Sequence, residues 1–312
     1  MPVIEPALAP SFTINNVKGI IWILVSVLGS SAMTIAVRGA ALSLDSRMVV
    51  LLRSSLTLAI LIAGIILFTK LRRQMRFSRP WLHVSRGIMI GISTHLGFYT
   101  IATIPLATAT VLFFMAPIFA TILSVIVHKE QVGPRRIAAI VIGFVGALVI
   151  IRPGFGAFHP AMLSAIGSSV LFAAALNQSR GIAEADGSFA ALFSSVLATV
   201  VVSVPLAAPV FEIPAGLIAW ASVFLLVATG ALRNVADIEA YRHGEAAVIA
   251  PFTYLRLVLI GLAAYWLFDE VPDQFTLVGA VIIIAATVYI ARREALLGRA
   301  AKKPSGPVAP PR

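Results

Sequence analysis

The segment AAVIAPFTYLRLVLIGLAAYWLFDE, residues 246–270, is long and apolar enough to cross a bilayer, yet it contains Pro251, Tyr254 and Arg256. A membrane-spanning helix needs about 20 apolar residues. A charged side chain near its middle costs at least ~2.5 to 3.5 kcal/mol. Arg256 lies about ten residues into the segment, roughly 15 Å along a helix, which makes it difficult for the side chain to reach the membrane surface. The segment therefore predicts a membrane protein in which Arg256 has a partner inside the membrane.

The composition of the whole chain agrees with this interpretation. Of its 312 residues, 59% are hydrophobic and only 12% are charged, whereas a globular domain carries about 25% charged residues. The net charge of +11 does not indicate a nucleic-acid partner, because no basic patch is interleaved with aromatic residues. The chain has no Cys, and its five His residues lack the spacing of metal ligands, so we expect no metal and no cofactor.

The hydropathy pattern predicts an all-α membrane protein with ten transmembrane helices. A disordered N-terminus (1–17) precedes them and a disordered, basic, Pro-rich tail (294–312) follows. The predicted spans are 19–37, 48–68, 82–104, 106–127, 137–151, 160–178, 189–209, 217–237, 246–268 and 276–291.

The distribution of basic residues predicts the orientation of these spans. If both termini are cytoplasmic, most of the 24 Lys and Arg residues fall in cytoplasmic segments or tails, and only Arg38, Arg47 and Arg152 fall on the opposite side. This bias follows the positive-inside rule. We therefore expect both termini in the cytoplasm.

An internal repeat relates the two halves of the chain. When the halves are aligned so that Glu130 meets Glu270, each Glu ends a long apolar segment, and Arg152 meets Arg292. Five spans per half is an odd number, so corresponding loops lie on opposite faces of the membrane. The pattern predicts two inverted five-helix repeats, 18–152 and 153–293, an arrangement typical of secondary transporters.

The run YTIATIPLATATVLFFMAPIFATILSVIVHKEQVGPRRIAAIVIGFVGALVIIRPG, residues 99–154, resembles the EamA-type transporters of the drug/metabolite transporter superfamily. The matching features are the ATAT turn, Pro117, the Glu130 loop, the Gly143 and Gly146 pair, and Arg152-Pro153-Gly154. Residues 240–273, AYRHGEAAVIAPFTYLRLVLIGLAAYWLFDEVPD, are similar to the second half of that family.

The resemblance implies a multi-pass secondary transporter, not an enzyme, in the bacterial cytoplasmic (inner) membrane. Its partners would be the lipid bilayer and a small polar or anionic metabolite such as an amino acid or carboxylate, moved by alternating access between the halves. The sequence does not decide whether the protein forms a homodimer. The alternatives are an exporter of amphiphilic drugs or toxic metabolites, a channel, or an intramembrane enzyme. No GxxxxGK[ST] motif occurs, which excludes ATP drive within this chain at the level of motifs.

Arg256 is the first candidate for binding the substrate, through a carboxylate or phosphate. Its structural alternatives are an ion pair with Asp237 or a bond to a freed backbone carbonyl. Pro117 and Pro251 each predict a helix break, which a membrane helix tolerates next to a cavity, although either break can be an ordinary kink.

The other candidates are polar or aromatic residues of the predicted spans. His95 and Tyr99 share a helix face, and His95 is suited either to proton coupling or to a neutral hydrogen bond; Asp237 is a second proton-coupling candidate. Arg53 is close enough to a helix end for its side chain to reach the interface. The remaining predicted substrate-binding residues are Phe114, Asn177, Arg233, Asn234 and Tyr254.

Overall fold

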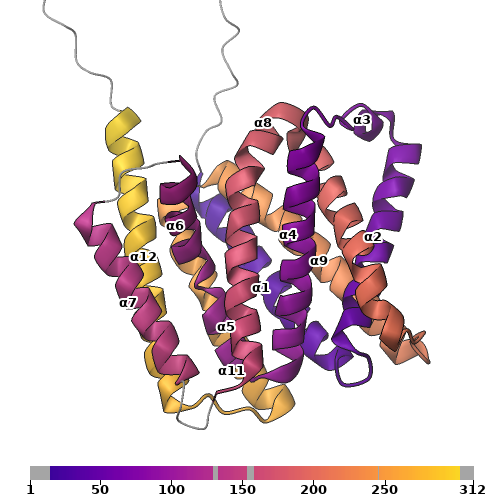
Figure 1. The fold of residues 1–312 in the computed structure, drawn as a ribbon. Helices are drawn as coiled ribbons and strands as arrows, with labels where there is room; N and C mark the ends of the chain where they lie inside the picture. The colour runs from indigo at the N-terminus through magenta and orange to yellow at the C-terminus, as the bar shows by residue number, and fades with distance from the viewer. Residues whose placement is uncertain (1–14, 129–132, 153–157, 245, 303–312) are drawn as a thin grey trace, which may run out of the picture.

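The computed structural model describes residues 15–128, 133–152, 158–244 and 246–302. Their regular secondary structure is entirely helical (Figure 1). The elements are α1 (Asn16–Ala40), α2 (Ser46–Leu67), α3 (Thr69–Arg72), α4 (Pro80–Thr103), α5 (Leu106–Phe113), α6 (Ala116–His128), α7 (Pro134–Ile151), α8 (Pro160–Ala207), η1 (Ala208–Val210), α9 (Leu217–His243), α10 (Ala246–Ile249), η2 (Ala250–Tyr254), α11 (Leu255–Phe268) and α12 (Gln274–Lys302). Residues 1–14 and 303–312, in the predicted disordered ends, and Glu130 lie outside the described residues.

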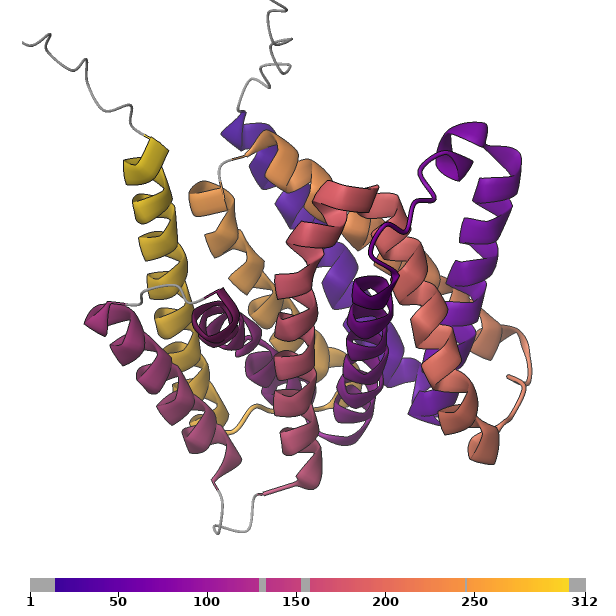
Figure 2. The same ribbon diagram turned by 45° about the horizontal axis from the view of Figure 1, so that its top comes forward.

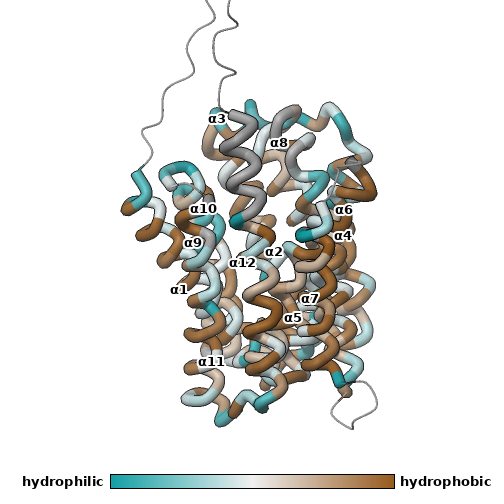
Figure 3. The backbone as a smooth tube through the Cα atoms, turned by 90° about the vertical axis from the view of Figure 1, so that its left-hand side faces the viewer, coloured by the Kyte–Doolittle hydropathy of each residue, from teal (hydrophilic) through white to brown (hydrophobic). Residues whose placement is uncertain are grey.

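The described chain is an all-helical membrane protein. It contains eight helices long and apolar enough to cross a membrane, and a shorter apolar helix at Ile137–Ile151. Helix α4 has 24 residues but does not belong to these eight, because polar residues such as His83, Arg86 and His95 lower its hydropathy. Apolar residues concentrate along the middle of the helices and hydrophilic residues at the ends of the bundle (Figure 3).

Several helix boundaries differ from those expected. The predicted loop between 178 and 189 is helical, because α8 continues through it and bends at Gly187. The φ of 84° at Gly187 lies in a region that residues with a Cβ rarely adopt. Helix α9 continues to His243, and α12 to Lys302, so the predicted disordered tail is helical over 294–302.

Two of the predicted spans are broken helices. The span 106–127 is divided into α5 and α6, which are separated at Phe114 and Met115. The span 246–268 is divided into α10, the 3-10 turn η2 and α11. Pro117 lies in the first turn of α6, where a missing backbone N–H costs little, and Pro251 lies in η2.

Helices from opposite halves of the sequence pack against each other. The most extensive contacts pair α4 with α8, α1 with α9, and α7 with α12. Helix α11 also packs on α1, and α5 and α6 pack on α8. We call α1, α9 and α11 the α1 group, and α4, α5, α6 and α8 the α4 group (Figure 2). The halves of the sequence are therefore interleaved.

An apolar cluster joins the two groups at one end of the bundle. It includes Val37 and Ala40 of α1, Ile101 of α4, Leu106 of α5 and Ala264 of α11. The start of α1 and the end of α12 lie at the opposite end, at the top of Figure 1.

Candidate functional site

A stripe of polar residues follows one face of α1. Ser26, Ser30, Thr34 and Arg38 are spaced four residues apart, which places them on the same side of a helix. Ser26 and Ser30 are each 4% exposed and Thr34 is 0% exposed. We call these four residues the α1 stripe.

Three members of the α1 stripe contact charged residues from the second half of the chain. The Ser26 hydroxyl donates a hydrogen bond to Asp237 of α9. Thr34 Oγ1 accepts a hydrogen bond of 2.9 Å from Arg256 Nη2. Arg38 forms an ion pair with Glu270 at 2.6 Å. The stripe thus connects charges at successive depths along α1.

Arg256 lies in the first turn of α11, directly after η2. Its Nε is buried and has no hydrogen-bond partner among the described residues. A buried donor that lacks a partner costs about 1–3 kcal/mol, and more when it is charged. The guanidinium therefore has unused capacity to bind an acceptor, and an anionic group would satisfy it best.

The surroundings of Arg256 carry an excess of positive charge. Arg233 of α9 lies near enough to repel both Arg256 and Arg53. Asp237 is the nearby carboxylate, and it pairs with Arg233, whose Nε lies 3.5 Å from Asp237 Oδ2. The expected alternative of an Arg256–Asp237 ion pair therefore does not describe this structure. Among the described residues, three arginines against one carboxylate favour an anionic ligand.

Arg53 is a residue whose surroundings the sequence did not predict. It stacks over the ring of Phe98 at 5.7 Å, and its Nε is buried without a partner among the described residues. We had expected the side chain to reach the membrane interface. Ser26 and Thr34 were missed as well, although the four-residue spacing of hydroxyl residues in α1 is a signal that reveals them.

The two broken helices meet at their aromatic residues. The rings of Phe114 and Tyr254 lie 5.1 Å apart. Phe114 and Tyr254, both predicted from the sequence, therefore lie together. Tyr254 is two positions before Arg256 in the chain. Asn177 instead donates a hydrogen bond of 3.3 Å to the Ala120 carbonyl, and Asn234 is exposed on α9.

His95 and Tyr99 are not brought to the α1 stripe. His95 Nε2 lies 2.8 Å from Ser203 Oγ of α8, and the residue is 8% exposed. Tyr99 is 42% exposed. This geometry fits the alternative that we left open, a histidine with a hydrogen-bonded structural partner.

A second histidine joins α4 to the bend of α8. His83 Nε2 lies 3.0 Å from Asp186 Oδ2, and Nδ1 lies 2.8 Å from Ser194 Oγ. The combination resembles a hydrolytic triad, but the side chains of His83 and Asp186 are only 3% and 1% exposed. Asp186 also accepts hydrogen bonds from the backbone N–H and hydroxyl of Ser78. The cluster fixes the bend at Gly187 and offers no entry to a substrate.

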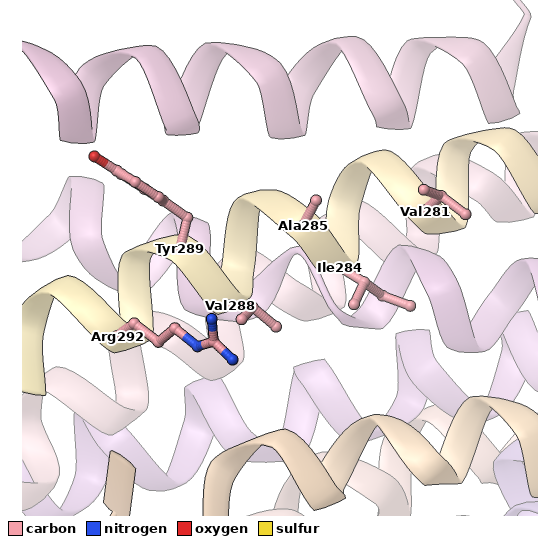
Figure 4. Close-up of a pocket in the computed structure, with 6 residues that line it drawn as sticks. All are labelled: Val281, Ile284, Ala285, Val288, Tyr289 and Arg292. Atoms are coloured by element: carbon pink, nitrogen blue, oxygen red, sulfur yellow. The ribbon is translucent and has the colours of Figure 1, made fainter. Parts of the chain in front are cut away.

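An apolar hollow on α12 is a separate feature. Figure 4 shows its six lining residues on this one helix. They are Val281, Ile284, Ala285, Val288, Tyr289 and Arg292. Five apolar or aromatic residues and one Arg on a single helix do not surround a polar metabolite, so the α1 stripe and Arg256 form the better candidate site.

The described part of the chain is a bundle of apolar helices around partly buried arginines. Two segments of the chain, residues 17–152 and 159–292, match the EamA-like transporter family. The chain belongs to this family and is a transporter, not an enzyme.

The curated relatives are also transporters. The chain is 32% identical over 272 residues to an S-adenosylmethionine uptake transporter of Rickettsia bellii, covering 87% of this chain and 92% of the relative. It is 29% identical to a pseudopaline exporter of Pseudomonas aeruginosa, over 86% of this chain and 95% of the relative. A riboflavin transporter of Rhizobium johnstonii is 31% identical, over 70% and 73% of the two chains. With the apolar helices, these bacterial relatives make the chain a multi-pass inner-membrane protein that moves small molecules.

A solved crystal structure shares the fold. The TM-score is 0.58 with 19% sequence identity, and the match covers 92% of this chain and 99% of the other. At this identity the match concerns the fold alone.

Proposed function

We propose that this protein is a secondary transporter that moves a small carboxylate-bearing metabolite by alternating access. The cargo class is an amino acid or amino-acid conjugate, of which S-adenosylmethionine is the first compound to test. Arg256 binds the cargo carboxylate, while Arg233 and Asp237 recognise further charged groups.

The observation that carries this proposal is the guanidinium of half-buried Arg256, which has one protein partner for Nη2, in Thr34, and none among the described residues for its buried Nε. The Rickettsia bellii relative takes up S-adenosylmethionine, which contains both an α-carboxylate and an α-ammonium group. Arg256 suits the carboxylate and Asp237 suits the ammonium group.

The proposed topology has ten spans in two inverted repeats, with α4, α7 and the two limbs of α8 each crossing the membrane. Both termini are cytoplasmic. The start of α1 and the end of α12 lie at the same end of the bundle as α3 (Figure 1), and α3 is basic through Lys70 and Arg72, in keeping with the positive-inside rule.

The experiment is counterflow in proteoliposomes loaded with S-adenosylmethionine or with single amino acids. The wild-type protein should accumulate labelled cargo transiently and saturably, whereas sustained non-saturating flux would indicate a channel. Arg256→Ala should reduce the rate by about 10- to 100-fold, the effect of losing one charge-assisted contact of ~1.5 to 3 kcal/mol.

Arg47→Gln is the matched control, because Arg47 pairs with Asp45 at the surface, with 40% of its side chain exposed. Its transport rate should equal that of the wild-type protein. Unchanged counterflow in Arg256→Ala, for a cargo that the wild-type protein carries, would reject the proposed role of Arg256.

A further inference from the structure

The ion pair between Arg38 and Glu270 lies at the end of the bundle opposite the start of α1. Arg38 is in the last turn of α1, and Glu270 follows α11 by two residues. Arg38 Nη2 and Glu270 Oε1 are 2.6 Å apart, and the side chains are 19% and 13% exposed. Both residues belong to, or directly follow, helices of the α1 group.

This pair also holds the α4 group. Arg38 Nη1 donates to the carbonyls of Ala102, at 2.7 Å, and Ile101, at 3.1 Å, in the last turn of α4. The second carboxylate oxygen of Glu270 accepts a hydrogen bond of 2.7 Å from the backbone N–H of Leu106, the first residue of α5.

These contacts match the free groups of the two helix ends. The last carbonyls of a helix and its first N–H groups lack partners within the helix. A cation is stabilised at a helix C-terminus and an anion at a helix N-terminus. Arg38 therefore stabilises the C-terminus of α4, and Glu270 stabilises the N-terminus of α5. Each carries the charge that its helix end favours.

The two ends of the bundle differ in which groups they connect. At the Arg38 end, polar contacts and the apolar cluster around Ala264 join the α1 group to the α4 group. At the other end, the hydrogen bond from Asn15 N to the His243 carbonyl, of 2.8 Å, lies within the α1 group. The His83–Asp186 contact lies within the α4 group.

We propose that the contacts of Arg38 and Glu270 with the turn between α4 and α5 form a releasable latch, oriented by their ion pair, that holds this end of the transporter closed and opens once in each transport cycle. The proposal rests on the alternating-access function proposed above. Arg38 lies one helical turn, about 6 Å, beyond Thr34 on the α1 stripe. A movement of α1 that follows a change at Arg256 therefore also acts on the latch.

The chain contains no Cys, so a single Ala264→Cys substitution provides a specific reporter. Ala264 is 0% exposed and accepts a hydrogen bond from the backbone N–H of Glu270. The full chain in lipid nanodiscs is reacted with a water-soluble maleimide, and the labelling rate is measured. Glu270→Gln in the reporter background should raise this rate by about tenfold or more, because a charge-assisted contact is lost.

Combining Arg38→Gln with Glu270→Gln should add little to the single substitution, because either change already breaks the same latch. Arg38→Lys retains the charge but lacks the guanidinium fork that reaches three acceptors, so it should give an intermediate rate. Arg38→Lys also serves if Glu270→Gln does not yield a monodisperse protein.

The matched control is Asp45→Asn, which breaks the ion pair with Arg47 in the connection between α1 and α2. The hydrogen bonds of Arg47 lower the pKa of Asp45, so this is also a charged pair, but it does not join the two groups. Its labelling rate should equal that of the reporter alone.

An unchanged labelling rate in a folded latch variant, an equal rise in Asp45→Asn, or additive rises in the double variant would overturn the proposal. The measurement needs no cargo. Failure of the latch is therefore distinct from failure of the carboxylate site, which the counterflow of Arg256→Ala reports.

Discussion

The two broken helices of this transporter both have an interrupted backbone, but the residues that follow the two breaks differ in chemistry. The pair α5 and α6 is interrupted at Phe114 and Met115, and the pair α10 and α11 is interrupted by η2. The ring of Phe114, at the first break, lies 5.1 Å from the ring of Tyr254, at the second break. After the first break the chain continues with apolar residues, whereas after the second it places Arg256 in the first turn of α11.

This difference distinguishes residues that shape the fold from residues that bind the cargo. A break lets a helix change direction and leaves backbone groups for other partners, and both breaks do this without a charge. Only the second break adds a guanidinium. We therefore expect substitutions in η2 and α11 to change cargo binding, and equivalent substitutions in α5 and α6, away from the contact between Phe114 and Tyr254, to change mainly stability.

The largest expected effect comes from straightening the second break. Pro251→Ala restores a backbone N–H, favours a continuous helix and rotates Arg256 away from Thr34. Transport should fall by up to about 100-fold, since misplacing a binding group by about 1 Å can cost this much. Pro117→Ala, in the first turn of α6, should change the transport rate by less than about tenfold. Equal losses in counterflow would contradict the comparison.

A smaller effect is expected from the partner of Arg256. Thr34→Val removes the 2.9 Å hydrogen bond but keeps the shape of the side chain. The Kd for cargo should rise about tenfold, because a bond to a charged group contributes ~1.5 kcal/mol or more. Isothermal titration measures it. Ser31→Ala is the control, because Ser31 lies outside the α1 stripe and donates to the Val27 carbonyl of its own helix. Tighter binding in Thr34→Val would show that Thr34 competes with the cargo.

The smallest effect concerns the contact between the broken helices. Phe114→Leu removes the ring that lies against Tyr254, and aromatic pairs contribute about 0.5–1.5 kcal/mol. Cargo affinity should fall by a few-fold, and Phe224→Leu, in the Trp220–Phe224 pair within α9, should leave it unchanged. If the two variants had the same affinity in titration, the Phe114–Tyr254 contact would have no part in the site.

The sequence predicts the membrane class and the apolar spans because hydropathy and charge are local properties. It also identifies Arg256 as a candidate residue, because a charge in an apolar segment is visible without a structure. It does not reveal which helices pack together. The pairing of α1 with α9 and of α4 with α8 joins residues far apart in the sequence, 211 positions for Ser26 and Asp237 and 75 for Ser93 and Ser168, so the interleaving of the halves could not be derived.

The same limit explains why the partners of several predicted site residues could not be found from the sequence. The partner of His95 is Ser203, and one of the two partners of Asp237 is Ser26, each far away in the sequence. Arg53 was assigned to the interface from its depth in the helix, whereas its surroundings depend on Phe98 of α4 and Arg233 of α9. Depth along a helix is readable from sequence, but the direction of a side chain among its neighbours is not.

The most direct test of the central claim compares the affinity of the transported compound with that of its methyl ester, in the wild-type protein and in Arg256→Gln. The ester keeps the size of the cargo and removes the carboxylate charge. If Arg256 binds the carboxylate, the wild-type protein should prefer the acid by about tenfold or more, and Arg256→Gln should lose most of this preference. An undiminished preference in Arg256→Gln would contradict the account.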